Sequence, residues 1–255
     1  MPKERGRSLS LSLPRRWMED MLHSARRVPV IAGERPIKVR ALADARRATK
    51  NPPSWQSLVT KGMGMVSMKI PALRHAYMPY PWPHLYEAPY SVASVIFDRM
   101  YNGEHATFMA PLLHPERLTL GKIQDKVQSW IKDPIEAHGV LRRLVRNAKP
   151  PRLIRRFLWW SGMNWNGCLR ARNFGTFGVN TVANLRGRVL QFQTPITSVW
   201  YYGSVSKTGE MMISGACDHR VFDGYTAAWA TSELESAFNN ELLEEVRSIS
   251  REAKH

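Results

Sequence analysis

The 255-residue sequence is poor in cysteine, in acidic residues and in long apolar runs. Its two cysteines, Cys168 and Cys217, form neither a metal-ligand cluster nor a disulfide framework, which indicates a reducing compartment and predicts a cytoplasmic protein. No apolar run approaches the roughly 20 residues that span a bilayer. Residues 1–12 lack the apolar core and cleavage site of a secretory signal, so we expect a flexible basic arm.

The charge balance is strongly basic. With 37 Lys and Arg residues against 21 Asp and Glu, the net charge is +16, which should attract nucleic acid, an anionic membrane or an acidic carrier protein. No recognised nucleic-acid-binding motif accompanies the charge, so nucleic acid ranks last of the three. Because 44% of the residues are hydrophobic, the chain can bury a sizeable core. We predict one domain over residues 13–247 and a charged tail over 248–255.

Residues 218–224 (DHRVFDG) organise the sequence. They follow an apolar run at 211–217 and precede a helical pattern that opens near Tyr225, so the sequence predicts a strand, a tight polar turn and a helix. A histidine at a strand end, His219, can take up and return a proton at neutral pH, and Asp223 can anchor the turn. The spacing alone favours a surface histidine in a loop salt bridge, because short motifs match by chance.

The heptapeptide and its flanks resemble the catalytic signature of dihydrolipoyl acyltransferase cores of 2-oxo-acid dehydrogenase complexes and of chloramphenicol acetyltransferases. Residues 202–207 (YGSVSK) and 175–180 (GTFGVN) resemble two earlier strands of those cores, in the same order. The resemblance implies a chloramphenicol acetyltransferase-like α/β fold, an α+β two-layer sandwich with a mixed central sheet covered by helices. It also implies a homotrimer, or a larger cage of trimers, with the active site between subunits.

The resemblance implies acyl transfer from a coenzyme A or carrier-protein thioester to a hydroxyl, thiol or amine, with His219 as general base and no bound cofactor or metal. Where those cores place an oxyanion-binding serine, this sequence has Asn180, followed by Thr181. Successive strand residues face opposite ways, so only one of these two can serve. An arginine on the opening helix, Arg15 or Arg16, is expected to hold Asp223.

The remaining pattern predicts the frame around this site. Apolar residues three and four apart predict a helix over 13–28, with Arg15, Arg16, Glu19 and Asp20 on its solvent side. The pattern also predicts a helix capped by Ser54, a helix over 118–131 with Thr119 as its cap, a hairpin of strands 90–100 and 105–112 joined at Asn102-Gly103, a turn at 184–188, strands over 189–193 and 199–205, and a last helix over 226–246. The aromatic and proline-rich residues 77–86 predict a rigid exposed loop or the wall of a ligand site.

Residues 135–165 differ most from the resembled cores. Seven basic residues alternate there with leucines, Phe157 and two tryptophans, and Pro150 and Pro151 divide the segment into two pieces. This composition is typical of an interfacial amphipathic segment. A membrane contact, docking of an acidic carrier and plain solvated charge fit it equally well.

Two functions therefore remain from the sequence. The chain has no lipoyl domain or Ala/Pro-rich linker pattern, so a free-standing acyltransferase that uses acyl-CoA or an acyl carrier protein is expected rather than a component of a dehydrogenase complex. The alternative is a catalytically impaired trimeric scaffold that binds an anionic membrane, at the inner membrane face, or an acidic protein. The intact turn with His219 favours the enzyme, and Asn180 in place of serine favours the scaffold.

Overall fold

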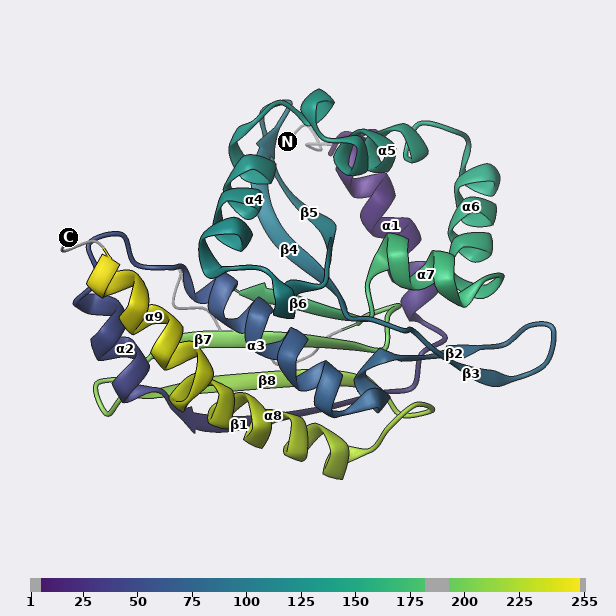
Figure 1. Cartoon of the computed structure of the whole chain (residues 1–255). Helices are drawn as coiled ribbons and strands as arrows, with labels where there is room; N and C mark the ends of the chain where they lie inside the picture. The colour runs from purple at the N-terminus through teal and green to yellow at the C-terminus, as the bar shows by residue number, and fades with distance from the viewer. Residues whose placement is uncertain (1–5, 182–192, 253–255) are drawn as a thin grey trace, which may run out of the picture.

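The computed structural model describes residues 6–181 and 193–252, which form a twisted mixed sheet with helices packed on both of its faces (Figure 1). The sheet has the strand order β1-β8-β7-β6-β4-β5. Its strands are β1 (Val30–Lys38), β4 (Val92–Tyr101), β5 (Glu104–Leu113), β6 (Phe177–Thr181), β7 (Ser198–Val205) and β8 (Glu210–Asp218). The pairs β4–β6 and β6–β7 are parallel and the other pairs antiparallel.

The larger core lies on one face of the sheet. Helices α2 (Arg40–Arg47), α3 (Trp55–Lys69), α4 (Leu120–Lys132), α8 (Gly224–Asn239) and α9 (Glu241–Glu252) contribute to it. Helices α3 and α8 approach closely at Gly62, where a Cβ atom would lie 2.6 Å from a methyl carbon of Leu234. Ser54 and Thr119 cap α3 and α4 by accepting hydrogen bonds from backbone N–H groups, as the sequence predicts.

A smaller core lies on the opposite face. It is formed by α1 (Leu13–Ala25) with α5 (Gly139–Asn147), α6 (Arg152–Asn164) and α7 (Gly167–Phe174). Trp17 of α1 packs against Trp159 of α6 with ring centroids 6.1 Å apart. The two prolines separate α5 from α6 as predicted, whereas α7 was not foreseen. The segment that differs most from the resembled cores thus builds a second helical layer.

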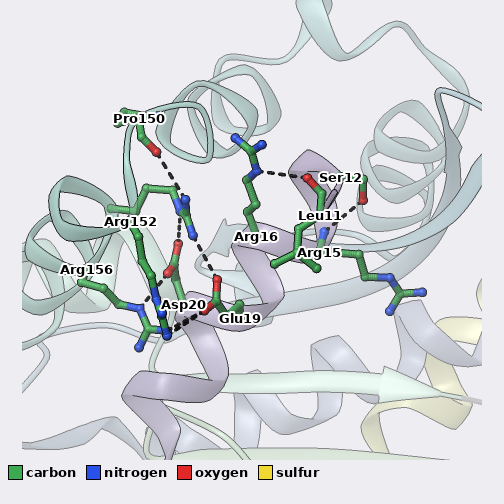
Figure 2. A network of polar contacts seen from close by, with 10 residues as sticks. Leu11, Ser12, Arg15, Arg16, Glu19, Asp20, Pro150, Arg152 and Arg156 are labelled. Atoms are coloured by element: carbon green, nitrogen blue, oxygen red, sulfur yellow. Dashed lines mark hydrogen bonds and ion pairs between the residues drawn. The ribbon is translucent and has the colours of Figure 1, made fainter. Parts of the chain in front are cut away.

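The predicted solvent side of α1 is wrong for Asp20, while Glu19 is partly exposed. Asp20 is only 1% exposed, and its carboxylate bonds Arg155 Nε at 2.7 Å and lies 2.9 Å from Arg156 Nε. Glu19 bonds the same two arginines and also Arg152, each at 3.1 Å (Figure 2). The network attaches α6 to α1, so three of the seven basic residues of the segment are paired with carboxylates rather than free.

Two further boundaries differ from the predicted ones. The last helix is divided at Asn240, whose backbone leaves the helical region (φ −120°, ψ −93°), and α9 continues to Glu252, so the tail predicted to start at 248 is largely helical. Residues 77–86 fall in a two-stranded hairpin apart from the main sheet, β2 (His75–Met78) and β3 (His84–Glu87). The turn predicted at 184–188 and most of the strand predicted at 189–193 lie outside the described residues.

Candidate active site

The turn between β8 and α8 has the predicted form of strand, turn and helix. Strand β8 ends at Asp218 and α8 begins at Gly224, so the heptapeptide spans the connection. The backbone N–H of His219 donates to the Pro29 carbonyl oxygen (2.9 Å), just before β1. This bond continues the pairing of β8 with β1 by one residue and fixes the place where the histidine leaves the sheet.

The His219 side chain is exposed, and one contact orients its ring. Its Nδ1 lies 3.4 Å from the Phe222 carbonyl oxygen. A carbonyl oxygen can only accept, so Nδ1 is the donor in this contact. Among the described residues nothing hydrogen-bonds Nε2. The contact therefore holds the ring by one nitrogen and leaves the other without a described partner.

The predicted arginine partner of Asp223 is wrong. Asp223 is the N-cap of α8, and its carboxylate accepts a hydrogen bond from the Thr226 N–H (3.1 Å), which lowers the pKa of this exposed carboxyl. Within the described chain neither Arg15 nor Arg16 reaches it. Arg16 Nε donates to the Leu11 carbonyl oxygen (3.0 Å), and the Arg15 N–H bonds the Ser12 hydroxyl (3.4 Å; Figure 2). Asp223 therefore holds the turn by capping the helix, and not through the ion pair that the resemblance implies.

A second carboxylate, which the sequence argument left without a role, holds the turn. Asp218 is fully buried and binds Arg220 through Nε (2.9 Å), Nη2 (2.7 Å) and the backbone N–H (3.1 Å). The guanidinium of Arg220 lies 4.2 Å from the ring centre of Tyr77. This fork is local in sequence, so the motif Asp-His-Arg is the signal that could have revealed it.

Asn180 and Thr181 face opposite sides of β6, as their adjacency predicts. The Thr181 hydroxyl donates to the Tyr202 carbonyl oxygen (3.1 Å). Asn180 instead lines a cavity of about 220 Å³, together with Trp17, Met21 and Tyr201. The Asn180 Oδ1 accepts from the Thr181 N–H (2.7 Å), and the Asn180 side chain also hydrogen-bonds Tyr201 at the cavity. Of the two candidates for an oxyanion donor, only Asn180 lines this cavity.

Tyr201 is a further polar group of this cavity that sequence reasoning missed. Burial raises the pKa of its hydroxyl, and a hydrogen bond with the Asn180 side chain opposes that rise. The residue pairs with Asn180 across neighbouring parallel strands. Nothing in the consecutive aromatic residues 200–202 of this strand distinguishes it beforehand.

The two halves of the candidate site do not meet within one chain. Asn180 pairs with Tyr201, and Tyr201 with Ser214, so His219 lies two strands away and five residues further along. With a rise of about 3.4 Å per residue and about 4.8 Å between strands, their separation is on the order of 20 Å. Within a single chain, the two candidate groups therefore cannot act on the same atom.

The described part of the chain offers no metal alternative. It contains no group of three His, Cys, Asp or Glu side chains that could hold a metal ion, and no helix long and apolar enough to cross a membrane. Cys168 is exposed and Cys217 is buried.

No protein-family model and no curated protein sequence matches the chain. Solved structures do. The dihydrolipoamide acetyltransferase of Azotobacter vinelandii, in which a serine, a histidine and an asparagine were studied for their role in the catalytic mechanism, is 14% identical with a TM-score of 0.67, over 97% of this chain and 95% of that one. The cubic core of the pyruvate dehydrogenase multienzyme complex is 14% identical with a TM-score of 0.64, over 97% and 95%.

A chloramphenicol acetyltransferase is also similar, at 10% identity and a TM-score of 0.53, over 89% of this chain and 97% of that one. The chain has the chloramphenicol acetyltransferase-like fold. This confirms the predicted fold class and the likeness inferred from residues 218–224. At such low identity the comparison concerns the fold alone, so the fold carries Asn180 and His219 at its two separated positions without assigning them a reaction.

Proposed function

We propose that this protein is an acyltransferase that moves an acyl group from a thioester of coenzyme A, or of an acyl carrier protein, to a hydroxyl, thiol or amine. The observation that carries the proposal is the turn that presents His219 with Nδ1 bonded to the Phe222 carbonyl and Nε2 available. The fold shared with acetyltransferase cores supports acyl transfer in general.

The working unit of the proposal is a homotrimer or a cage of trimers. His219 and Asn180 are on the order of 20 Å apart in one chain, so His219 of one subunit acts with Asn180 of its neighbour. The similarity to a cubic multienzyme core supports assembly of this kind. A site shared between subunits also explains why the His219 ring is exposed in the isolated chain.

In the proposed reaction, Nε2 of His219 takes the proton of the acceptor as the acceptor atom attacks the thioester carbonyl carbon. The bond to the acceptor forms, and the carbonyl oxygen becomes an oxyanion that receives a hydrogen bond from the Asn180 amide. The carbon–sulfur bond then breaks, and the departing thiolate takes the proton back from the imidazolium. Asp223, by capping α8, keeps the turn in place during both steps.

The first test is thiol release from acetyl-CoA and longer acyl-CoAs with a panel of acceptors. His219→Ala is expected to lower the rate by about 10²–10⁴-fold, and Asn180→Ala by about 10²–10³-fold. His105→Ala, which removes an exposed histidine from β5, is the matched control and should keep the wild-type rate. Equal rates for wild type and His219→Ala would refute the enzyme and leave the scaffold.

A second test addresses the shared site. Chains with His219→Ala and chains with Asn180→Ala are each inactive alone, but co-assembled they rebuild intact sites at the interfaces where each supplies the group the other lacks. Recovery of activity in the mixed oligomer is the expected result. Lack of recovery in oligomers proven to contain both chains would show that the two residues do not form one site.

One observation favours a peripheral membrane location as well, at the cytoplasmic face. The outer side of α6 and α7 exposes apolar residues, among them Leu153 (84%) and Trp165 (72%), on a chain of net charge +16. Binding to vesicles that contain anionic lipid should fall on Leu153→Asp and with rising salt. Leu9→Asp, at another exposed leucine, is the control, and equal binding by both variants would end this idea.

A further inference from the structure

A cleft of about 350 Å³ lies where five segments of the chain come together. They are the end of α1, the β2–β3 hairpin, helices α6 and α7, the residues just before β7, and the turn after β8. Tyr77, Pro79 and Tyr80 form its hairpin side, so part of the aromatic and proline-rich stretch is the wall of a cleft rather than only a loop. His219 is not among its lining residues, although Val28 and Arg220 beside it are.

The charged side chains that line the cleft are all basic, although Arg220 is already paired with the buried Asp218. Four arginines line it, Arg27, Arg156, Arg170 and Arg220, and its described lining includes no carboxylate. Arg27 is exposed at the rim and has no ion-pair partner among the described residues. Arg156 reaches Glu19 and Asp20 with Nη2 and Nε, but its Nη1 is buried without a described hydrogen-bond partner (Figure 2).

Arg170 is the most unusual of the four. It is only 5% exposed, and its guanidinium donates to the backbone carbonyls of Tyr77 (2.7 Å) and Pro195 (3.2 Å) rather than to any described carboxylate. Burial lowers its pKa to about 10, against the pull of the Asp218 charge. A buried cation that hydrogen-bonds no described carboxylate gains from an anion that approaches it, in addition to the more distant charge of Asp218.

Aromatic rings cover the remaining wall. Tyr80 meets Trp160 edge to face with ring centroids 5.4 Å apart, and Phe157 stacks on Trp160 at 6.1 Å. Phe157 is 63% exposed and Tyr80 46%, so these rings present free surface to a ligand. Flat apolar groups next to guanidinium groups favour a ligand that is charged at one end and apolar at the other.

We propose that this cleft binds a small organic anion, with one carboxylate or phosphate group directed at the arginines and a flat aromatic body against Tyr80 and Trp160. The volume lies at the low end of small-molecule sites, so the body is about one ring in size. The proposal does not require acyl transfer, because none of the cleft's lining residues is assigned a proton transfer or an oxyanion contact in the proposed reaction.

Isothermal titration calorimetry of the full chain with phenyl phosphate and phenylacetate tests it, with inorganic phosphate and benzyl alcohol as half-ligands. Both aryl anions are expected to bind more tightly than either half-ligand, and binding should weaken as salt rises. Arg27→Ala should weaken phenyl phosphate by about tenfold. Arg26→Ala, which removes the neighbouring exposed arginine outside the cleft, should leave the affinity unchanged.

A second variant separates the aromatic wall from the charge. Trp160→Leu should reduce the preference for phenyl phosphate over ethyl phosphate by about threefold to tenfold and leave the affinity for inorganic phosphate as it was. The proposal is overturned if phenyl phosphate binds no better than inorganic phosphate. It is equally overturned if Arg26→Ala weakens binding as much as Arg27→Ala, since the attraction would then come from the general charge of the chain.

Discussion

The two faces of the sheet are held by different forces. On the larger face, α3 and α8 pack apolar side chains so closely that Gly62 admits no Cβ atom without displacing Leu234. On the smaller face, α1 meets α6 through Trp17 and Trp159 but also through a set of carboxylates and guanidiniums buried between the helices (Figure 2). The larger face has an ordinary apolar core. The smaller face adds a charged clamp, the ion pairs that join α1 to α6.

The difference indicates that the ion pairs of the smaller face position a helix more than they stabilise the domain. Buried ion pairs contribute little net stability, because desolvation offsets most of their attraction, but they are strongly position-specific. The clamp therefore fixes where α6 lies on α1 more than it stabilises the domain. Since α1 lines the Asn180 cavity and α6 lines the arginine cleft, the clamp sets the relation between the two sites.

Removing the buried carboxylate of the clamp should have the largest effect. Asp20→Ala leaves Arg155 and Arg156 without their buried partner and is expected to lower the free energy of unfolding by about 3–5 kcal/mol. Urea unfolding followed by circular dichroism measures it. Asp20→Ala combined with Arg155→Met and Arg156→Met should recover much of the loss, because the uncompensated charges are gone. No recovery would mean that the clamp stabilises by attraction after all.

Removing apolar volume from the larger face should cost somewhat less. Leu234→Ala deletes a fully buried side chain that contacts α3 and is expected to lower the free energy of unfolding by about 3 kcal/mol. No charge is exposed or unpaired, so the loss should be the same in low and high salt. A loss that changed with salt would contradict an apolar origin for this core.

The contrast also explains which features the sequence could predict. Helical spacing, the caps Ser54 and Thr119, and the Asn-Gly hairpin each depend on neighbours within a few residues, and the structure confirms all of them. Asp20 was placed on the solvent side because a charged residue is usually solvated. Its partner Arg155 lies 135 positions away, so no local pattern could reveal the pair.

The candidate site divides in the same way. His219 and Asp223 lie in one heptapeptide, and both the turn and the start of α8 follow from it. The prediction of an arginine partner for Asp223 is wrong because it depends on the tertiary position of a helix, which the local sequence does not determine. The positions of Arg170 and Tyr201 could not be predicted, because they depend on tertiary packing, which brings α7 against the hairpin and β7 against Asn180.

The exposed side of the clamp should matter less than its buried side. Glu19 is 29% exposed, and water replaces part of what it gives to Arg152, Arg155 and Arg156. Glu19→Gln keeps the shape and removes the charge, so the free energy of unfolding should fall by about 1 kcal/mol, and less in high salt. A loss as large as that of Asp20→Ala would mean that the difference in exposure does not affect how much the two carboxylates contribute to the free energy of unfolding.

The smallest effect concerns alkaline pH and belongs to the larger face. Burial, and then the charge of Asp218, raise the pKa of the Cys217 thiol to about 12 from an ordinary value of 9.0. Above pH 9 the unfolded thiol loses its proton while the folded one keeps it, so the folded state binds more protons and stability falls as pH rises toward 12. The slope contributed by one such group is at most about 1.4 kcal/mol per pH unit. Cys217→Ala should therefore reduce the pH dependence of the free energy of unfolding, measured in urea between pH 8.5 and 10, by an amount on the order of that slope. This holds whatever the substitution does to stability at neutral pH. An unchanged slope would show that the Cys217 thiol loses its proton as easily in the folded state as in the unfolded state. The core of the larger face would then be accessible to water at β8, the strand that precedes His219.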